Sequence, residues 1–297
     1  MGKRKCRKVK PNKLKFKDII EKHKGTPAVI CGHGPSLNED KERIEKLQGS
    51  GNLLRFSVNN WYHYFQSAPD YWIISNSQFS FPIMHEIMNK YKSPVFYSTD
   101  GDFSSDEYIE SILECDYLPY DQRHFKGHDC VKILKSFKDY QTKNKNFDFR
   151  EYGNNGVMWH PPRIKYPDGW AGFDLYGRCC KMIDRTQLTI QEELQKQTGL
   201  DRHYSTGDTV ALHAIAFAIL MGCNPIYLSG VDLSYRLGYA REDIALHEDH
   251  FTLWEDNHKN LLSDLTILLE SANSKDIKIV NLNKNPWFDL FPVSKLP

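Results

Sequence analysis

Several features are missing from this 297-residue sequence, and each absence excludes a class of protein. The longest apolar run, residues 214–221, is far shorter than the roughly 18 residues of a membrane-spanning helix. The N-terminus lacks the apolar core of a secretory signal. The seven cysteines include no Cys-x-x-Cys pair, which argues against a zinc ribbon and a disulfide scaffold. We therefore expect a cytoplasmic protein with reduced thiols.

The net charge of +1 hides an uneven distribution of charge along the chain. Residues 1–17 contain nine Lys and Arg side chains and no acid, so subtracting them leaves −8 for the rest. We expect this basic tail to contact an anionic membrane surface or a nucleic acid, which would make the protein peripheral at such a surface. With 40% apolar and 26% charged residues, the whole chain has the composition of a globular protein.

Short apolar runs alternate with helical patterns along much of the chain. The expected strands cover 27–31, 53–58, 71–74, 94–97, 225–229 and 277–280, and the expected helices cover 16–23, 37–48, 210–221 and 257–272. This alternation predicts an α/β fold with a doubly wound, mostly parallel, Rossmann-like sheet. We expect a basic tail and short helix over 1–24. A single Rossmann-like domain follows over 25–297, with an insertion at approximately 100–203 that we interpret as a lid or an acceptor-side region.

A turn rich in small residues follows the first expected strand, with the sequence Gly32-His33-Gly34-Pro35-Ser36. It lacks the third glycine of a dinucleotide fingerprint and the lysine of a P-loop. Its glycines would let the sugar or phosphate of a ligand approach the backbone, and the following helix N-terminus favours negative charge. The alternative interpretation is a tight turn whose serine caps the helix.

Polar residues also follow the later strands or precede the apolar helix. They are Asn59, Asn76, Ser205, Thr206, Gly207 and Asp232. Ligands of parallel sheets bind at the carboxyl ends of the strands, so these positions favour a nucleotide or phosphorylated ligand. Ordinary capping is the alternative for the group at 205–207. The carboxylate of Asp232 would orient a hydroxyl, position a histidine or cap a turn.

Two further groups have both a chemical and a structural interpretation. His247 and His250 form a His-x-x-His pair, with His258 downstream, but no third metal ligand has matching spacing. A general base and a solvated loop therefore both remain open for these histidines. Asp100 and Asp102 would hold a divalent ion on a diphosphate, or form a common Asp-Gly turn.

The order of these motifs resembles that of the bacterial sialyltransferases that use CMP-sialic acid. The matching segments are Cys31-Gly-His-Gly-Pro-Ser-Leu37, Ser57-Val-Asn59, Ser75-Asn-Ser77, Ser205-Thr-Gly207 and Ile226-Tyr-Leu-Ser-Gly-Val-Asp232. A related group with motility-associated glycosyltransferase-like proteins and a pterin pyrophosphokinase has similar patterns. The resemblance covers about 30–80 and 203–283, and it implies a variant of the GT-A fold.

The resemblance also implies roles for individual residues. The implied donor-binding residues are Gly32, Gly34, Pro35, Ser36, Asn59, Asn76, Ser205, Thr206, Gly207 and Asp232. Tyr235 and Tyr239 lie one residue away from the tyrosines that stabilise the departing phosphate in the family. His250 is the best match to the family's base, which precedes the last long helix, and His258 is the alternate. His33 stands where the family usually has Asn.

The function implied is sugar transfer from a CMP-sugar, carrying sialic acid or a relative, to a glycan or other hydroxyl acceptor. The resemblance implies that no metal or other cofactor is required. Two alternatives remain: Mg-dependent pyrophosphoryl or nucleotidyl transfer, and non-catalytic binding of nucleic acid or an anionic surface by the tail. The sequence is also compatible with a homo-oligomer.

Overall fold

The structure is a computed structural model of the whole chain. It describes residues 11–74, 82–98, 110–120, 164–166, 169–171, 190–200, 202, 209–233, 239–241, 248–284 and 289–297. Within the described elements, the side chains of 82–83, 164–166, 169–171 and 248–260 are not described.

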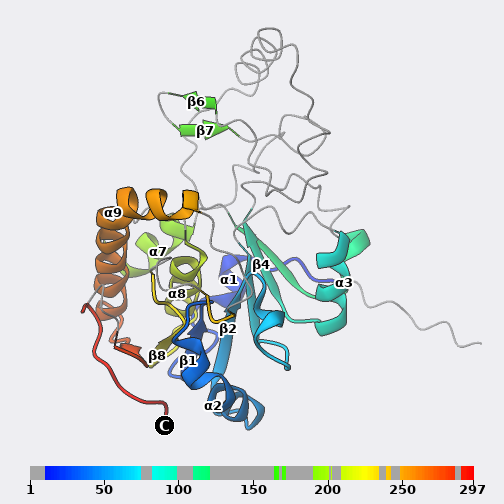
Figure 1. Cartoon of the computed structure of the whole chain (residues 1–297). Helices are drawn as coiled ribbons and strands as arrows, with labels where there is room; N and C mark the ends of the chain where they lie inside the picture. The colour runs from blue at the N-terminus through cyan, green and yellow to red at the C-terminus, as the bar shows by residue number, and fades with distance from the viewer. Residues whose placement is uncertain are drawn as a thin grey trace, which may run out of the picture.

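Seven parallel strands form the main sheet, in the order β5-β4-β3-β2-β1-β8-β9 (Figure 1). These strands are β1 (Ala28–Cys31), β2 (Leu54–Val58), β3 (Tyr71–Ile74), β4 (Val95–Ser98), β5 (Tyr117–Tyr120), β8 (Ile226–Ser229) and β9 (Ile279–Asn281). The chain moves outward from β1 to β5 and then returns to place β8 on the other side of β1. The strand order therefore reverses between β1 and β8, and the predicted doubly wound parallel sheet is confirmed.

Helices pack on both faces of this sheet. They are α1 (Phe16–Ile19), α2 (Leu37–Gly49), the 3-10 helix η1 (Trp61–His63), α3 (Pro82–Tyr91), α7 (Ile190–Thr198), α8 (Val210–Leu220) and α9 (Glu248–Asn273). In Figure 1, α7, α8 and α9 gather on one side of the sheet. A separate antiparallel hairpin joins β6 (Ile164–Tyr166) to β7 (Gly169–Ala171).

Two apolar cores lie on opposite faces of the sheet because successive strand side chains alternate in direction. In β1, Ala28 and Ile30 belong to the core formed with α7, α8 and α9. Val29 and Cys31 belong to the core formed with α2, η1 and α3. Every residue of α8 is buried, which explains why its sequence is apolar on all sides.

Terminal segments cover both edges of the sheet. The N–H of Leu14 donates to the carbonyl of Tyr117 in β5, and the N–H of Tyr117 donates to the carbonyl of Asn12. At the other edge, Val293 pairs with Asn281 of β9. The segment 12–14 is thus part of the fold, although it lies within the basic tail expected over 1–24.

The observed elements differ from the predicted ones mainly after residue 100. The six predicted strands are confirmed to within two residues. The last helix begins at Glu248, not at 257, because the polar sequence of its first turns weakens the apolar periodicity. Both β5 and α7 fall within the range expected for the insertion, yet β5 pairs with β4 and α7 adds Ile190 and Leu194 to the core.

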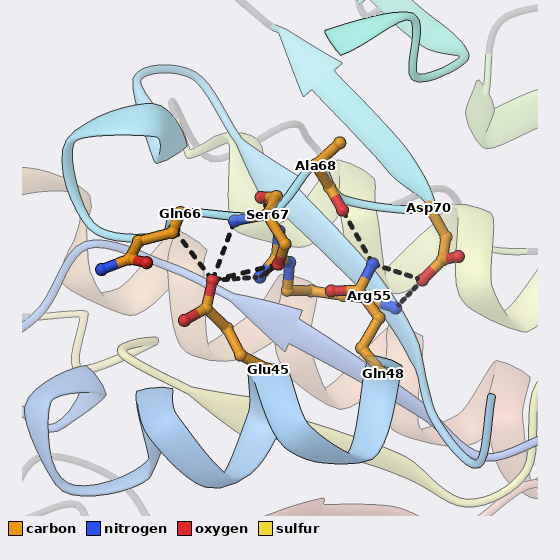
Figure 2. Close-up of polar contacts among 7 residues, drawn as sticks. All are labelled: Glu45, Gln48, Arg55, Gln66, Ser67, Ala68 and Asp70. Carbon is orange, nitrogen blue, oxygen red and sulfur yellow. Dashed lines mark hydrogen bonds and ion pairs between the residues drawn. The ribbon is translucent and has the colours of Figure 1, made fainter. Parts of the chain in front are cut away.

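A buried arginine fixes the connection between β2 and β3 (Figure 2). The Arg55 side chain is fully buried, and its guanidinium donates to the carbonyl and hydroxyl oxygens of Ser67. It also lies over the ring of Phe65, 4.1 Å from the centroid, and 3.8 Å from a carboxylate oxygen of Glu45. That oxygen accepts the backbone N–H groups of Gln66 and Ser67 at 2.8 and 2.9 Å. Helix α2 is thereby tied to the loop that leads into β3.

Asp70 completes this network at the start of β3. Its Oδ2 accepts the backbone N–H of Arg55 at 2.8 Å and the side-chain amide of Gln48 at 3.0 Å. The amide of Gln48 also donates to the carbonyl of Ala68 (Figure 2). The network therefore anchors the far end of the β2–β3 connection, whose near end carries residues 59–64 at the carboxyl edge of the sheet.

We predict that Glu45→Ala lowers the free energy of unfolding by about 2–3 kcal/mol, because it removes the carboxylate beside a buried guanidinium and leaves two backbone N–H groups without their acceptor. Glu45→Gln retains an acceptor oxygen and should lose less. Urea denaturation measures both. Glu42→Ala, an exposed position on the same helix, is the control. Equal losses for Glu45→Ala and Glu42→Ala would contradict the role of the network.

Candidate functional site

The turns that follow β1 and β8 face each other at the point where the strand order reverses. This position, outside the carboxyl ends of the strands, is where doubly wound sheets bind ligands. The N–H of Gly32 donates to the carbonyl of Ser229 at 2.9 Å, and the N–H of Gly34 donates to that of Gly230 at 2.8 Å. The backbone pairing of β1 with β8 therefore continues into both turns.

A carboxylate joins the two turns through side-chain contacts. Asp232 accepts the backbone N–H of Ser36 at 3.0 Å and the Ser36 hydroxyl at 2.5 Å. The same hydroxyl oxygen accepts the N–H of Gly230 at 3.1 Å. We call these contacts among Ser36, Gly230 and Asp232 the Ser36–Asp232 clamp. They place a negative charge at the N-terminus of α2, where such a charge is favourable.

The close approach of the two turns explains the glycines in the first one. A Cβ atom on Gly32 would lie 2.2 Å from the carbonyl oxygen of Gly230. A Cβ atom on Gly34 would lie 2.2 Å from Oδ2 of Asp232. Neither distance is compatible with a side chain, so these glycines are required by packing whether or not a ligand also approaches them.

The first turn of α2 has few donors to offer a ligand phosphate. The N–H of Ser36 donates to Asp232, and those of Leu37 and Asn38 donate to the carbonyls of Gly34 and Pro35 at 3.0 and 3.1 Å. The carboxylate of Asp232 occupies the place where an anion would bind. We therefore no longer expect a phosphate at this helix N-terminus. The hydrogen-bond donors for a phosphate would have to come from neighbouring segments.

Segment 239–241, which contains Tyr239, contacts the turn after β1. The N–H of Ala240 donates to the carbonyl of His33, and the side-chain amide of Asn38 donates to the carbonyl of Ala240, both at 2.8 Å. The side chain of Tyr239 is half-buried, and burial raises the pKa of its hydroxyl. The hydroxyl therefore stays protonated near neutral pH and is available as a hydrogen-bond donor.

Asn59 lies at the same edge, immediately after β2. Its N–H donates to the carbonyl of Ile73 at 2.9 Å, and its carbonyl accepts the indole N–H of Trp72 at 2.8 Å. Its φ of 39° is in the left-handed region, which asparagine tolerates better than most residues. The chain therefore leaves β2 in a direction fixed by two contacts with β3.

His33 lies between the ends of β1 and β2. Its Nε2 is 2.9 Å from the carbonyl oxygen of Val58, and its ring stacks on that of Tyr64 with centroids 4.8 Å apart. Burial lowers the pKa of His33 to about 4, and nearby His63 acts in the same direction. The ring is therefore neutral at pH 7. In the sequence, this histidine stands out only by its unusual place in the turn, because its contacts, Val58 and Tyr64, are distant in the chain.

The structure brings together seven of the residues expected from the sequence. They are Gly32, Gly34, Pro35, Ser36, Asn59, Asp232 and Tyr239. Asn76, Ser205, Thr206, Gly207 and Tyr235 lie outside the described residues. The backbones of His250 and His258 lie within α9, and their side chains lie outside the described part of the chain. His250 therefore lies in the first turn of the last helix instead of preceding it.

The described residues add two findings about metals and membranes. No group of three or more His, Cys, Asp or Glu side chains among them is arranged to hold a metal ion. Asp100 and Asp102, the candidate carboxylates for a divalent ion, are outside the described residues. No described helix combines the length and the hydropathy needed to cross a membrane.

Comparison with known proteins gives distant structural similarity alone. No protein-family model matches the sequence, and no curated protein matches it. The chain is similar to a variant of the sialyltransferase CST-II in complex with CMP, with 16% identity, a TM-score of 0.38, and coverage of 86% of this chain and 80% of that one. It is also similar to the sialyltransferase CstII from Campylobacter jejuni in complex with CMP-3FNeuAc, with 16% identity, a TM-score of 0.34, and coverage of 86% and 79%.

We predict that Gly34→Ala lowers the free energy of unfolding by about 1–3 kcal/mol, because the added methyl group overlaps Asp232 and forces the clamp apart. Gly49→Ala is the control, since no heavy atom lies within 4 Å of a Cβ atom built there. It should be neutral or stabilise α2 by up to about 1 kcal/mol. Chemical denaturation measures both, and equal effects would show that the two turns do not approach as closely as described.

Proposed function

We propose that this protein is a glycosyltransferase that moves a sugar from a CMP-sugar, carrying sialic acid or a relative, to a hydroxyl acceptor. One observation carries the proposal. Gly34, Ser36, Asn59, Asp232 and Tyr239, which the sequence resemblance assigns to donor binding or phosphate departure, lie at a single edge of the sheet. This edge is at the reversal of strand order, where a nucleotide is expected in a doubly wound fold.

The proposed reaction is an inverting displacement at the anomeric carbon of the donor sugar. The acceptor oxygen forms a bond to this carbon while the bond from the carbon to the phosphate oxygen breaks. CMP departs with the bonding electron pair, and the acceptor hydroxyl gives its proton to a general base. We assign this base to His250, with His258 as the alternate, because imidazole titrates near neutral pH.

The leaving phosphate needs hydrogen-bond donors, and the clamp limits where they come from. Because Asp232 places a negative charge at the N-terminus of α2, we assign phosphate stabilisation to other segments. We assign a protonated hydroxyl donor to Tyr239, whose chain neighbour Ala240 is bonded to the turn after β1. Tyr235 and the group Ser205, Thr206 and Gly207 are proposed as its partners. Neutral donors of this kind can stabilise a departing phosphate without a metal ion.

We also propose that the basic residues of the tail tether the enzyme to an anionic surface. Because segment 12–14 pairs with β5, a deletion that tests this role has to stop before Asn12. Removing residues 2–10 takes away six of the nine basic side chains and leaves that pairing intact. None of the residues assigned to the proposed site lies in 2–10, so turnover of a small acceptor substrate should survive the deletion.

We predict that the protein, incubated with CMP-, UDP- and GDP-sugars in the presence of EDTA, releases free CMP alone. His250→Ala should retain the rise in Tm caused by CMP and lose release by about 100-fold or more, the scale of general-base catalysis. His258→Ala is the matched variant in the same helix and identifies the base if His250→Ala remains active.

Two results would contradict the proposal. One is the absence of any Tm increase with cytidine nucleotides. The other is turnover that requires Mg²⁺ and consumes a nucleoside triphosphate, which would favour pyrophosphoryl transfer instead.

A further inference from the structure

The tautomer of His33 follows from its one ring hydrogen bond. A carbonyl oxygen only accepts hydrogen bonds, so the 2.9 Å contact with Val58 requires a proton on Nε2. Burial lowers the pKa of the ring to about 4, and a neutral imidazole has only one N–H. The remaining nitrogen, Nδ1, therefore presents a lone pair and is a hydrogen-bond acceptor.

Two contacts hold the ring of His33 in this orientation, and a third holds its backbone. The end of β2 accepts its Nε2 proton, and the ring of Tyr64 stacks on it with an interplanar angle of 26°. The N–H of Ala240 holds its backbone carbonyl at 2.8 Å. A ring held by two contacts loses little conformational entropy when a ligand binds to it, which favours a role in recognition.

Among the described residues, the Nδ1 atom of His33 has no hydrogen-bond partner. The His33 side chain is half-buried and lies at the carboxyl edge of the sheet, next to the Ser36–Asp232 clamp. It is therefore a fixed and accessible acceptor at the reversal of strand order.

The charge of the surroundings indicates which ligand group this acceptor takes. The neighbouring turn carries the carboxylate of Asp232, and the N–H groups of Gly32, Gly34 and Ser36 are bonded within the protein. Acceptors thus dominate this part of the edge, which disfavours a phosphate and favours a neutral group that donates. In a nucleotide bound at this edge, the ribose hydroxyls are such donors.

We infer that Nδ1 of His33 accepts a hydrogen bond from a ribose hydroxyl of the bound nucleotide and so distinguishes ribonucleotides from deoxyribonucleotides. The inference rests on the proposed function, because it takes a cytidine nucleotide as the ligand. It makes His33 a specificity-determining residue in addition to the proposed base and tyrosines.

Two variants separate this role from the structural contact with Val58. His33→Gln places an amide nitrogen close to the position of Nε2, so it keeps a donor for Val58 and removes the acceptor at Nδ1. His33→Asn does the reverse, because its side-chain oxygen is near the position of Nδ1 and its amide does not reach Val58. A purely structural role would leave the Gln variant normal and impair the Asn variant.

The experiment compares calorimetric titrations of CMP and 2′,3′-dideoxy-CMP into the wild type and both variants, with urea denaturation as the check on folding. The wild type should bind CMP about tenfold more tightly, the equivalent of one hydrogen bond. The His33→Gln protein should bind both nucleotides equally, and His33→Asn should retain the preference.

The outcomes distinguish this inference from the proposed function. A tenfold preference that persists in His33→Gln, or equal binding of the two nucleotides by the wild type, overturns the role of His33 and leaves the proposed function standing. Failure of the wild type to bind CMP at all overturns both.

Discussion

The contact between Asp232 and Ser36 is the constraint on which the candidate site depends. It joins residues 196 positions apart in the sequence and fixes the turn after β1 against the turn after β8. The glycines at 32 and 34 follow from it, because a side chain at either position would overlap the second turn. The Ser36–Asp232 clamp thus fixes the turns after β1 and β8 against each other where the strand order reverses. We call this junction of the two turns the corner, and the candidate site residues lie around it.

The two sides of this contact differ in the hydrogen-bonding groups that they offer at the edge of the sheet. On the side of β1 and β2, the carboxylate of Asp232 and the Nδ1 lone pair of His33 are acceptors, which suits the hydroxyl groups of a ligand. On the side of segment 239–241, the hydroxyl of Tyr239 is protonated at neutral pH, as any tyrosine hydroxyl is, and burial raises its pKa further; a protonated hydroxyl suits a phosphate. The proposed sugar transfer accordingly assigns the ribose and the phosphate of the donor to different segments.

The sequence predicts the fold well where apolar runs are short and bounded, as in β1, β3 and β8, and the turn after β1 was identified from its glycines. It predicts the partners of these residues poorly. Asp232 was expected to bind a ligand, orient a hydroxyl, position a histidine or cap a turn. It does bind a hydroxyl, but the identity of that partner, Ser36, depends on a strand pairing that no local pattern reveals. Helix α9 begins nine residues early because its first turns are polar, and β5 was hidden within a segment of weak periodicity. The network around Arg55 was also not predicted, because nothing in the local sequence indicates that this charged residue in a strand is buried.

The central claim is that a nucleotide binds at the corner formed by the turns after β1 and β8. Hydrogen–deuterium exchange with and without CMP tests it most directly, because backbone amides exchange more slowly where a ligand suppresses local opening. Slower exchange is expected in peptides covering 32–36, 58–64, 231–233 and 239–241, with no change around Arg55 and Asp70 at the opposite end of the β2–β3 connection. Protection confined to other segments, with these peptides unchanged, would contradict the account.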